Sequence, residues 1–94
     1  MSLNLTLQAR KSKSNRWILK DLYQTPTDVT FKLLKKRNVF KAYAEWLPTR
    51  VTEYATTEEE RNQCLGHAHK HLQEVEQWIK EMKARGYRVV FSYI

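Results

Sequence analysis

The chain has 94 residues, a length that fits one domain able to bury a core without a metal or a disulfide. Hydrophobic residues make up 41% and aromatic residues 12%, with only two glycines and two prolines, which excludes a disordered or low-complexity chain. The net charge of +7 is uneven, because residues 1–50 carry +8 and residues 51–94 carry −1. An excess on one half of a chain creates a one-sided field that attracts polyanions.

The cysteine content and the hydropathy of the chain bear on its compartment. The one cysteine, Cys64, cannot form an internal disulfide, and no stretch resembles a signal peptide or a membrane span. These features predict a cytoplasmic protein that does not contact membranes. No internal repeat or linker is visible, so residues 1–94 are predicted to form a single compact domain.

The first predicted elements are two strands that pair as a hairpin. Leu3, Leu5 and Leu7 alternate with polar residues, which is the period of a strand with one buried face. A second strand is predicted from Trp17 to Leu22. The connection between the two strands is expected to be mobile and positively charged at its tip, since it carries Arg10, Lys11, Lys13 and Arg16.

A helix is predicted to follow over residues 26–47. Thr25 is its expected N-cap, and Pro48 stands just past its expected end. A competing interpretation is open, because β-favouring residues alternate with others over residues 28–34. In that interpretation a third strand precedes a short helix capped by Asn38. The helix has the better support, since its cap and its phase agree over a longer window, and a break just before Asn38 is compatible with it.

The longest periodic segment runs from Thr57 to Gly86 and predicts one long helix. Thr57 and Glu60 have the spacing of a capping box, and Gly86 supplies a left-handed stop. Apolar residues recur at steps of three and four and form one stripe, made of Leu65, Ala68, Leu72, Val75, Ile79 and Met82.

The chain ends in a segment, residues 87–94, that is rich in β-branched and aromatic residues and predicts a strand in the interior of the sheet. The order β-β-α-α-β indicates an α+β fold: a small antiparallel sheet with a long C-terminal helix and a second helix packed on one face. A sheet of three strands has exposed edges, and we therefore expect that a second copy can pair through an edge to form a homodimer.

Basic residues in the first half form the clearest candidate site. Over residues 31–46 they are interleaved with Phe31, Phe40, Tyr43 and Trp46, and such a surface can neutralise several phosphates. A solvated lysine face on an amphipathic helix is the alternative. No zinc-finger spacing, RNP-type motif or Gly-x-x-Gly loop separates DNA from RNA as the ligand. The predicted nucleic-acid contacts are Arg10, Lys11, Lys13, Arg16, Lys32, Lys35, Lys36, Arg37 and Lys41.

Three potential metal ligands, Cys64, His67 and His71, share one side of the long helix. They border the apolar stripe, so we interpret Cys64 and His71 as residues at the edge of the core and His67 and His69 as exposed. No metal or other cofactor is predicted. A thiol and an imidazole one turn apart on a rigid helix lack an orienting group and oxyanion donors, and no enzyme activity is predicted.

The sequence thus predicts a small, non-catalytic protein that binds DNA or RNA through its basic half. The alternative is an adaptor or inhibitor, expected to be a homodimer, that masks the surface of a protein partner. Trp17, Trp46 and Trp78 are candidates for anchors of the core or of such an interface. Salt separates the two functions, because binding to phosphates weakens steeply with salt and an apolar interface changes little.

Overall fold

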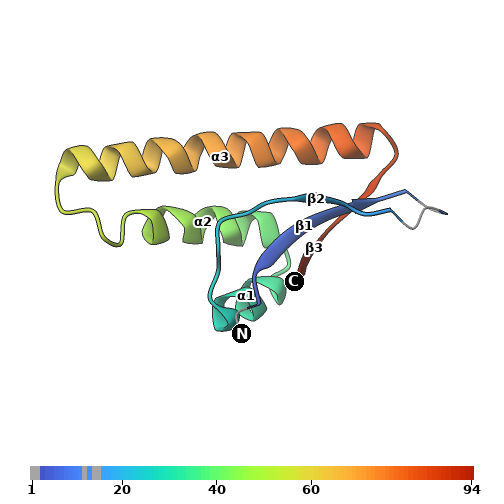
Figure 1. The fold of residues 1–94 in the computed structure, drawn as a ribbon, viewed down its shortest axis with the longest axis horizontal. Helices are drawn as coiled ribbons and strands as arrows, with labels where there is room; N and C mark the ends of the chain where they lie inside the picture. The colour runs from blue at the N-terminus through green and yellow to red at the C-terminus, as the bar shows by residue number, and fades with distance from the viewer. Residues whose placement is uncertain (1–2, 12, 14–15) are drawn as a thin grey trace.

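The sheet and the helices expected from the sequence are present in the computed structural model, which describes residues 3–11, 13 and 16–94. Figure 1 shows α3 along most of the length of the molecule, with α2 beneath one half of it and the sheet beneath the other. The elements in chain order are β1 (Leu5–Arg10), β2 (Ile18–Lys20), α1 (Thr27–Leu34), α2 (Val39–Val51), α3 (Glu58–Ala84) and β3 (Arg88–Tyr93). This order confirms the α+β class.

β1 is the central strand of an antiparallel sheet with the order β2-β1-β3. It pairs with β2 as the predicted hairpin and with β3 over its full length, from Leu5 opposite Tyr93 to Arg10 opposite Arg88. The prediction that the C-terminal strand is interior is wrong, because β3 is an edge strand. Its β-branched and aromatic composition indicates partial burial of side chains, and composition does not show on which side a strand finds its partner.

The two faces of the sheet have different neighbours. Leu5 and Phe91 lie on the face toward the helices and join the core cluster, which includes Leu33, Tyr43 and Leu47. Successive side chains of a strand point to opposite faces, so the even-numbered residues of β1 and β3 lie on the other face. None of their described side chains belongs to the core cluster, and we call this second surface the outer face.

α1 begins one residue later than expected, and Thr25 is not its N-cap. Pro26 occupies the cap position without a side-chain hydrogen bond. The buried hydroxyl of Thr25 instead accepts a hydrogen bond from the Leu5 N–H at 3.0 Å, and the Thr30 hydroxyl donates to the Leu3 carbonyl at 2.7 Å. These buried polar groups are satisfied, and they join the start of β1 to α1.

The helix predicted over residues 26–47 is divided into α1 and α2, and no strand forms over residues 28–34. The Asn38 side chain caps α2 by accepting a hydrogen bond from the Lys41 N–H at 3.0 Å. The predicted end before Pro48 is wrong, since α2 continues to Val51. A proline lacks an N–H and its ring crowds the preceding turn, but its carbonyl can still accept, and here it accepts a hydrogen bond from the Thr52 N–H at 3.3 Å.

α3 has the predicted ends. The Thr57 hydroxyl accepts a hydrogen bond from the Glu60 N–H at 3.1 Å, and the Glu60 carboxylate accepts one from the Thr56 N–H at 3.2 Å. Gly86 has a φ of +83°, and the Tyr87 N–H donates to the Met82 carbonyl at 2.9 Å, which is the Schellman arrangement. Along the predicted stripe, burial is strongest at Ala68, Val75 and Met82.

The polarity of the helices bears on a membrane location. Each helix in residues 3–11, 13 and 16–94 is too short or too polar to cross a bilayer. α3 has the length for a span, but glutamate and lysine occupy much of its surface.

We expect Leu47→Ala to lower the free energy of unfolding by about 2 to 5 kcal/mol, because Leu47 is fully buried and the substitution leaves a cavity. Leu65→Ala is the matched control, since Leu65 is 37% exposed, and its loss should stay below about 1 kcal/mol. Urea denaturation measures both losses. Equal losses at the two positions would contradict the location of the core.

Candidate nucleic-acid interface

The nine basic residues predicted as phosphate contacts are all exposed, and they divide between two regions. The hairpin cluster consists of Arg10, Lys11, Lys13 and Arg16. The corner cluster consists of Lys32, Lys35, Lys36, Arg37 and Lys41, at the end of α1 and the start of α2. In Figure 1 the end of β1 and the start of β2 lie at the right of the molecule, whereas α1 lies at the bottom near the middle. The two clusters are therefore separate surfaces.

The expected mobility of the hairpin tip concerns residues that lie partly outside the described part of the chain, namely 12, 14 and 15. Lys13 is described, and its φ of +74° lies in the left-handed region typical of turns. Arg10 ends β1, so the sheet fixes its position. One basic residue of the hairpin cluster is therefore held in place by the sheet.

The outer face of the sheet brings a second arginine to the hairpin cluster. Arg88 of β3 lies directly opposite Arg10 of β1. The Arg10 guanidinium lies 4.5 Å from the ring centroid of Trp17, a cation–π contact. Together with Val90, these three residues line a hollow of about 230 Å³. Two guanidiniums and an indole thus converge on one small concave surface.

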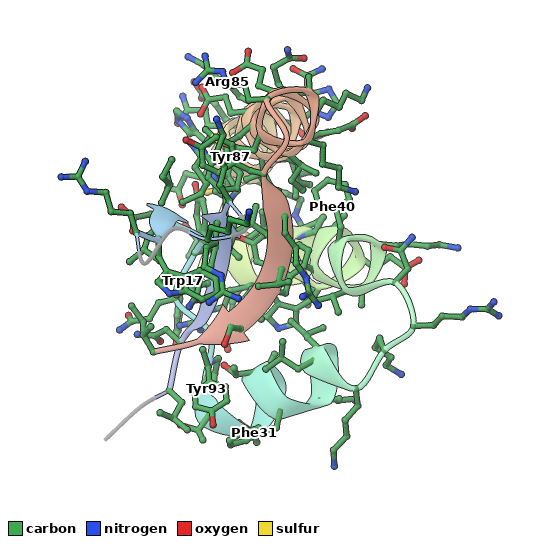
Figure 2. The ribbon with its side chains drawn as sticks, turned by 90° about the vertical axis from the view of Figure 1, so that its right-hand side faces the viewer. Trp17, Phe31, Phe40, Arg85, Tyr87 and Tyr93 are labelled. Carbon is green, nitrogen blue, oxygen red and sulfur yellow. The ribbon has the colours of Figure 1, made fainter. Side chains whose placement is uncertain are left out.

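The same combination of cation and aromatic ring occurs next to this hollow. The Lys11 ammonium lies 5.1 Å from the ring centroid of Tyr87, the residue that follows Gly86 at the end of α3. Figure 2 shows Tyr87 and Arg85 together near that end of α3, and Trp17 on the opposite side of the sheet from Phe40. The basic surface of the hairpin end therefore continues onto the end of α3.

In the corner cluster, Phe31, Tyr43 and Trp46 pack against other aromatic rings rather than against the lysines. Phe31 packs edge-to-face on Tyr93, with ring centroids 5.6 Å apart. Tyr43 is fully buried, and Trp46 packs against it with centroids 6.0 Å apart. Lys35 follows the last residue of α1 rather than standing on a helical face. The cluster can supply charge to a phosphate backbone, while Tyr43 and Trp46 belong to the core and Phe31 remains 39% exposed.

A groove of about 900 Å³ opens beside the corner cluster, between the start of α2, the second half of α3 and the helix-facing side of β3. Phe40, Ile79 and Phe91 give it an apolar lining. Its charged lining residues are Arg37, Lys80, Lys83 and Glu76, and Glu76 forms an ion pair with Lys80 at 3.1 Å. The groove therefore combines an apolar floor with an excess of positive charge.

Cys64 and His71 are half-buried, whereas His67 and His69 are exposed, as the sequence predicted. His71 Nε2 forms a hydrogen bond with the Tyr43 hydroxyl at 2.9 Å, so this imidazole already has a partner in the core. Among residues 3–11, 13 and 16–94 there is no group of three or more His, Cys, Asp or Glu side chains placed to hold a metal ion.

Two residues that lie beside the hairpin cluster were not predicted from the sequence as nucleic-acid contacts. They are Arg88 and Trp17. Trp17 directly follows Arg16, and a tryptophan next to a basic run is a usable signal for nucleic-acid binding. Arg88 gives no such signal, because its place beside Arg10 depends on the register of β3.

Neither a protein-family model, nor a curated protein, nor a solved structure matches this chain.

We expect acid to destabilise the protein through His71. Burial lowers the pKa of His71 below its ordinary value of 6.5, nearby Lys20 lowers it further, and Glu74 opposes the shift. The unfolded chain therefore binds this proton more readily, and the stability present above about pH 6.5 is lost as the pH falls toward the folded-state pKa. The melting temperature should drop between about pH 7.5 and pH 5.5.

His71→Gln removes this titration while leaving an amide oxygen to accept a hydrogen bond from Tyr43, so the drop should shrink in this variant. His67→Gln, which replaces an exposed histidine of the same helix, should retain the drop of the parent protein. An identical pH profile for the parent and His71→Gln would show that His71 does not contribute to the acid sensitivity.

Proposed function

We propose that the protein binds nucleic acid, DNA or RNA, without catalysis, and that the hairpin cluster and Arg88 are its principal contacts. One observation carries this proposal: Arg10 and Arg88 lie opposite each other on the outer face beside Trp17. Neither guanidinium forms an ion pair with a described carboxylate. Arginine is well suited to phosphate, because its planar fork of N–H donors makes two parallel hydrogen bonds.

The charge distribution supports the same function. Lys11 and Lys13 extend the positive surface from the outer face toward the turn of the hairpin. Each phosphate that such a residue neutralises releases condensed counterions, which gives affinity without sequence preference. The corner cluster contributes further phosphate contacts to a longer ligand. The one cysteine, Cys64, is a free thiol, which fits the cytoplasm as the compartment that we propose.

Three double substitutions test this function, each removing two positive charges. Lys11→Ala with Lys13→Ala changes the hairpin cluster, and Lys35→Ala with Lys36→Ala changes the corner cluster. Arg61→Ala with Lys70→Ala is the control, on exposed positions of α3 outside both clusters. Solvated side chains contribute little to stability, so all three variants should fold.

The measurement is the anisotropy of labelled DNA and RNA strands and duplexes across a salt series. The first two variants should each lower the slope of log affinity against log salt, by up to about two units on duplex DNA, while the control keeps the parental slope. Equal losses in all three variants would show only an effect of net charge. No measurable binding by the parent protein at low salt would overturn the function.

A second candidate function, binding of an acidic segment of a protein partner, is favoured by the groove beside the corner cluster. Its apolar lining can hold hydrophobic side chains, and the excess of Arg37 and Lys83 over acidic groups complements carboxylates. Val89 and Phe91 of β3 form part of its lining, and the outer edge of β3 is unpaired in the described sheet. An extended peptide can add to such an edge by backbone hydrogen bonds while its side chains enter the groove.

A labelled peptide that alternates glutamate with leucine and valine is the probe for the groove. Lys80→Glu with Lys83→Glu should abolish its binding, because the rim then repels the carboxylates, and Lys11→Ala with Lys13→Ala should leave binding unchanged. Analytical ultracentrifugation of the parent protein and of Phe40→Ala tests whether a second copy of the chain, rather than a peptide, occupies the groove. A dimer that dissociates in Phe40→Ala would assign the groove to a second copy of this chain instead.

A further inference from the structure

The hollow on the outer face has the composition of a site for an aromatic anion. Arg10, Trp17 and Arg88 come from three different segments, and strand pairing holds two of them in place. The hollow lies on the face of the sheet that contributes no described side chain to the core cluster. These residues are therefore available to a ligand without disturbing the packing of the helices.

The pair of arginines indicates the charge of the ligand. Like charges directly opposite each other on adjacent strands destabilise a sheet, and Arg10 and Arg88 occupy such positions. No described carboxylate compensates them by an ion pair. The cation–π contact with Trp17 disperses part of the charge of Arg10. An anion between the two guanidiniums would convert this repulsion into two attractive contacts.

The aromatic ring indicates the rest of the ligand. Trp17 is 45% exposed although it is the largest apolar side chain of the hairpin. Leu19, two residues further along and 52% exposed, lies on the same face, because it stands opposite Gln8. Exposed apolar side chains between cations suit a ligand that alternates flat apolar surfaces with negative charges. A nucleic-acid strand with unpaired bases has that chemistry.

We propose, on the basis of the function inferred above, that the ligand is a single strand, with one base stacked on Trp17 and its phosphate held between Arg10 and Arg88. A duplex cannot make the same contact, because its bases are stacked on each other and their faces are closed to a side chain. Leu19 provides apolar surface for the neighbouring base. The outer face therefore selects unpaired strands, whereas Lys11, Lys13 and the corner cluster bind phosphates of either form.

The test compares a fluorescein-labelled oligothymidine strand of about 15 nucleotides with its duplex of the same length. The parent protein should bind the single strand more tightly. Trp17→Ala should weaken binding of the strand by about 5- to 150-fold, the loss expected for one stacked base, and should leave binding of the duplex nearly unchanged. The slope of log affinity against log salt should stay at the parental value, since no charge is removed.

Two further variants give the roles of the individual residues. Trp17→Phe should restore most of the affinity, because phenylalanine also offers a ring face. Arg88→Ala should lower the salt slope on the single strand by about 0.7, the value for one phosphate contact. Tyr54→Ala, which removes an aromatic side chain that is 82% exposed in the α2–α3 connection, is the control and should bind as the parent does. Circular dichroism verifies the fold of each variant.

The outcomes separate this inference from the proposed function. Equal affinity for strand and duplex, together with no effect of Trp17→Ala on the strand, would overturn the inference and leave phosphate binding in place. Absence of binding to both forms at low salt would overturn the two together. A loss in Trp17→Ala that is the same for strand and duplex would also contradict stacking, since only the strand presents a free base.

Discussion

The hydroxyl of Tyr43 is the polar group on which the packing of this molecule depends. The side chain is fully buried, and a buried hydroxyl costs free energy unless it is hydrogen-bonded. It accepts a hydrogen bond from the Tyr23 N–H at 2.9 Å and forms another with His71 Nε2, also at 2.9 Å. It therefore joins the segment after β2 to α2 and α3, and the apolar cluster of Leu5, Leu33 and Leu47 surrounds this connection.

The unequal lengths of the helices place both candidate sites. α3 has 27 residues and α2 has 13, so α2 covers only one half of α3 and leaves the other half to the sheet. The groove opens where α2 begins, because beyond that point α2 no longer covers the surfaces of α3 and β3. The outer face of the sheet points away from the core cluster, which makes its arginines and Trp17 available to a ligand.

The parts of the structure that sequence could predict are those that depend on near neighbours in the chain. Thr57 caps α3 through an N–H three residues away, and Gly86 supplies the left-handed turn on its own, so both ends of α3 were predictable. The four residues of the hairpin cluster were predictable from the basic composition of this segment. The place of Arg88 beside Arg10 was not, since spacing within one strand shows which residues share a face but not which strand lies alongside.

The turn at Gly86 has a consequence for how this chain tolerates insertions and deletions. Only Tyr87 stands between Gly86 and the start of β3, so the length of this turn determines to which face of the sheet each side chain of β3 points. One added residue there that shifted the pairing by one position would send Val89 and Phe91 outward and Arg88 toward the core. The length of this short connection thus decides which residues of β3 face the helices and which face outward. An insertion of two residues, which keeps each side chain on its face, is therefore better tolerated than an insertion of one.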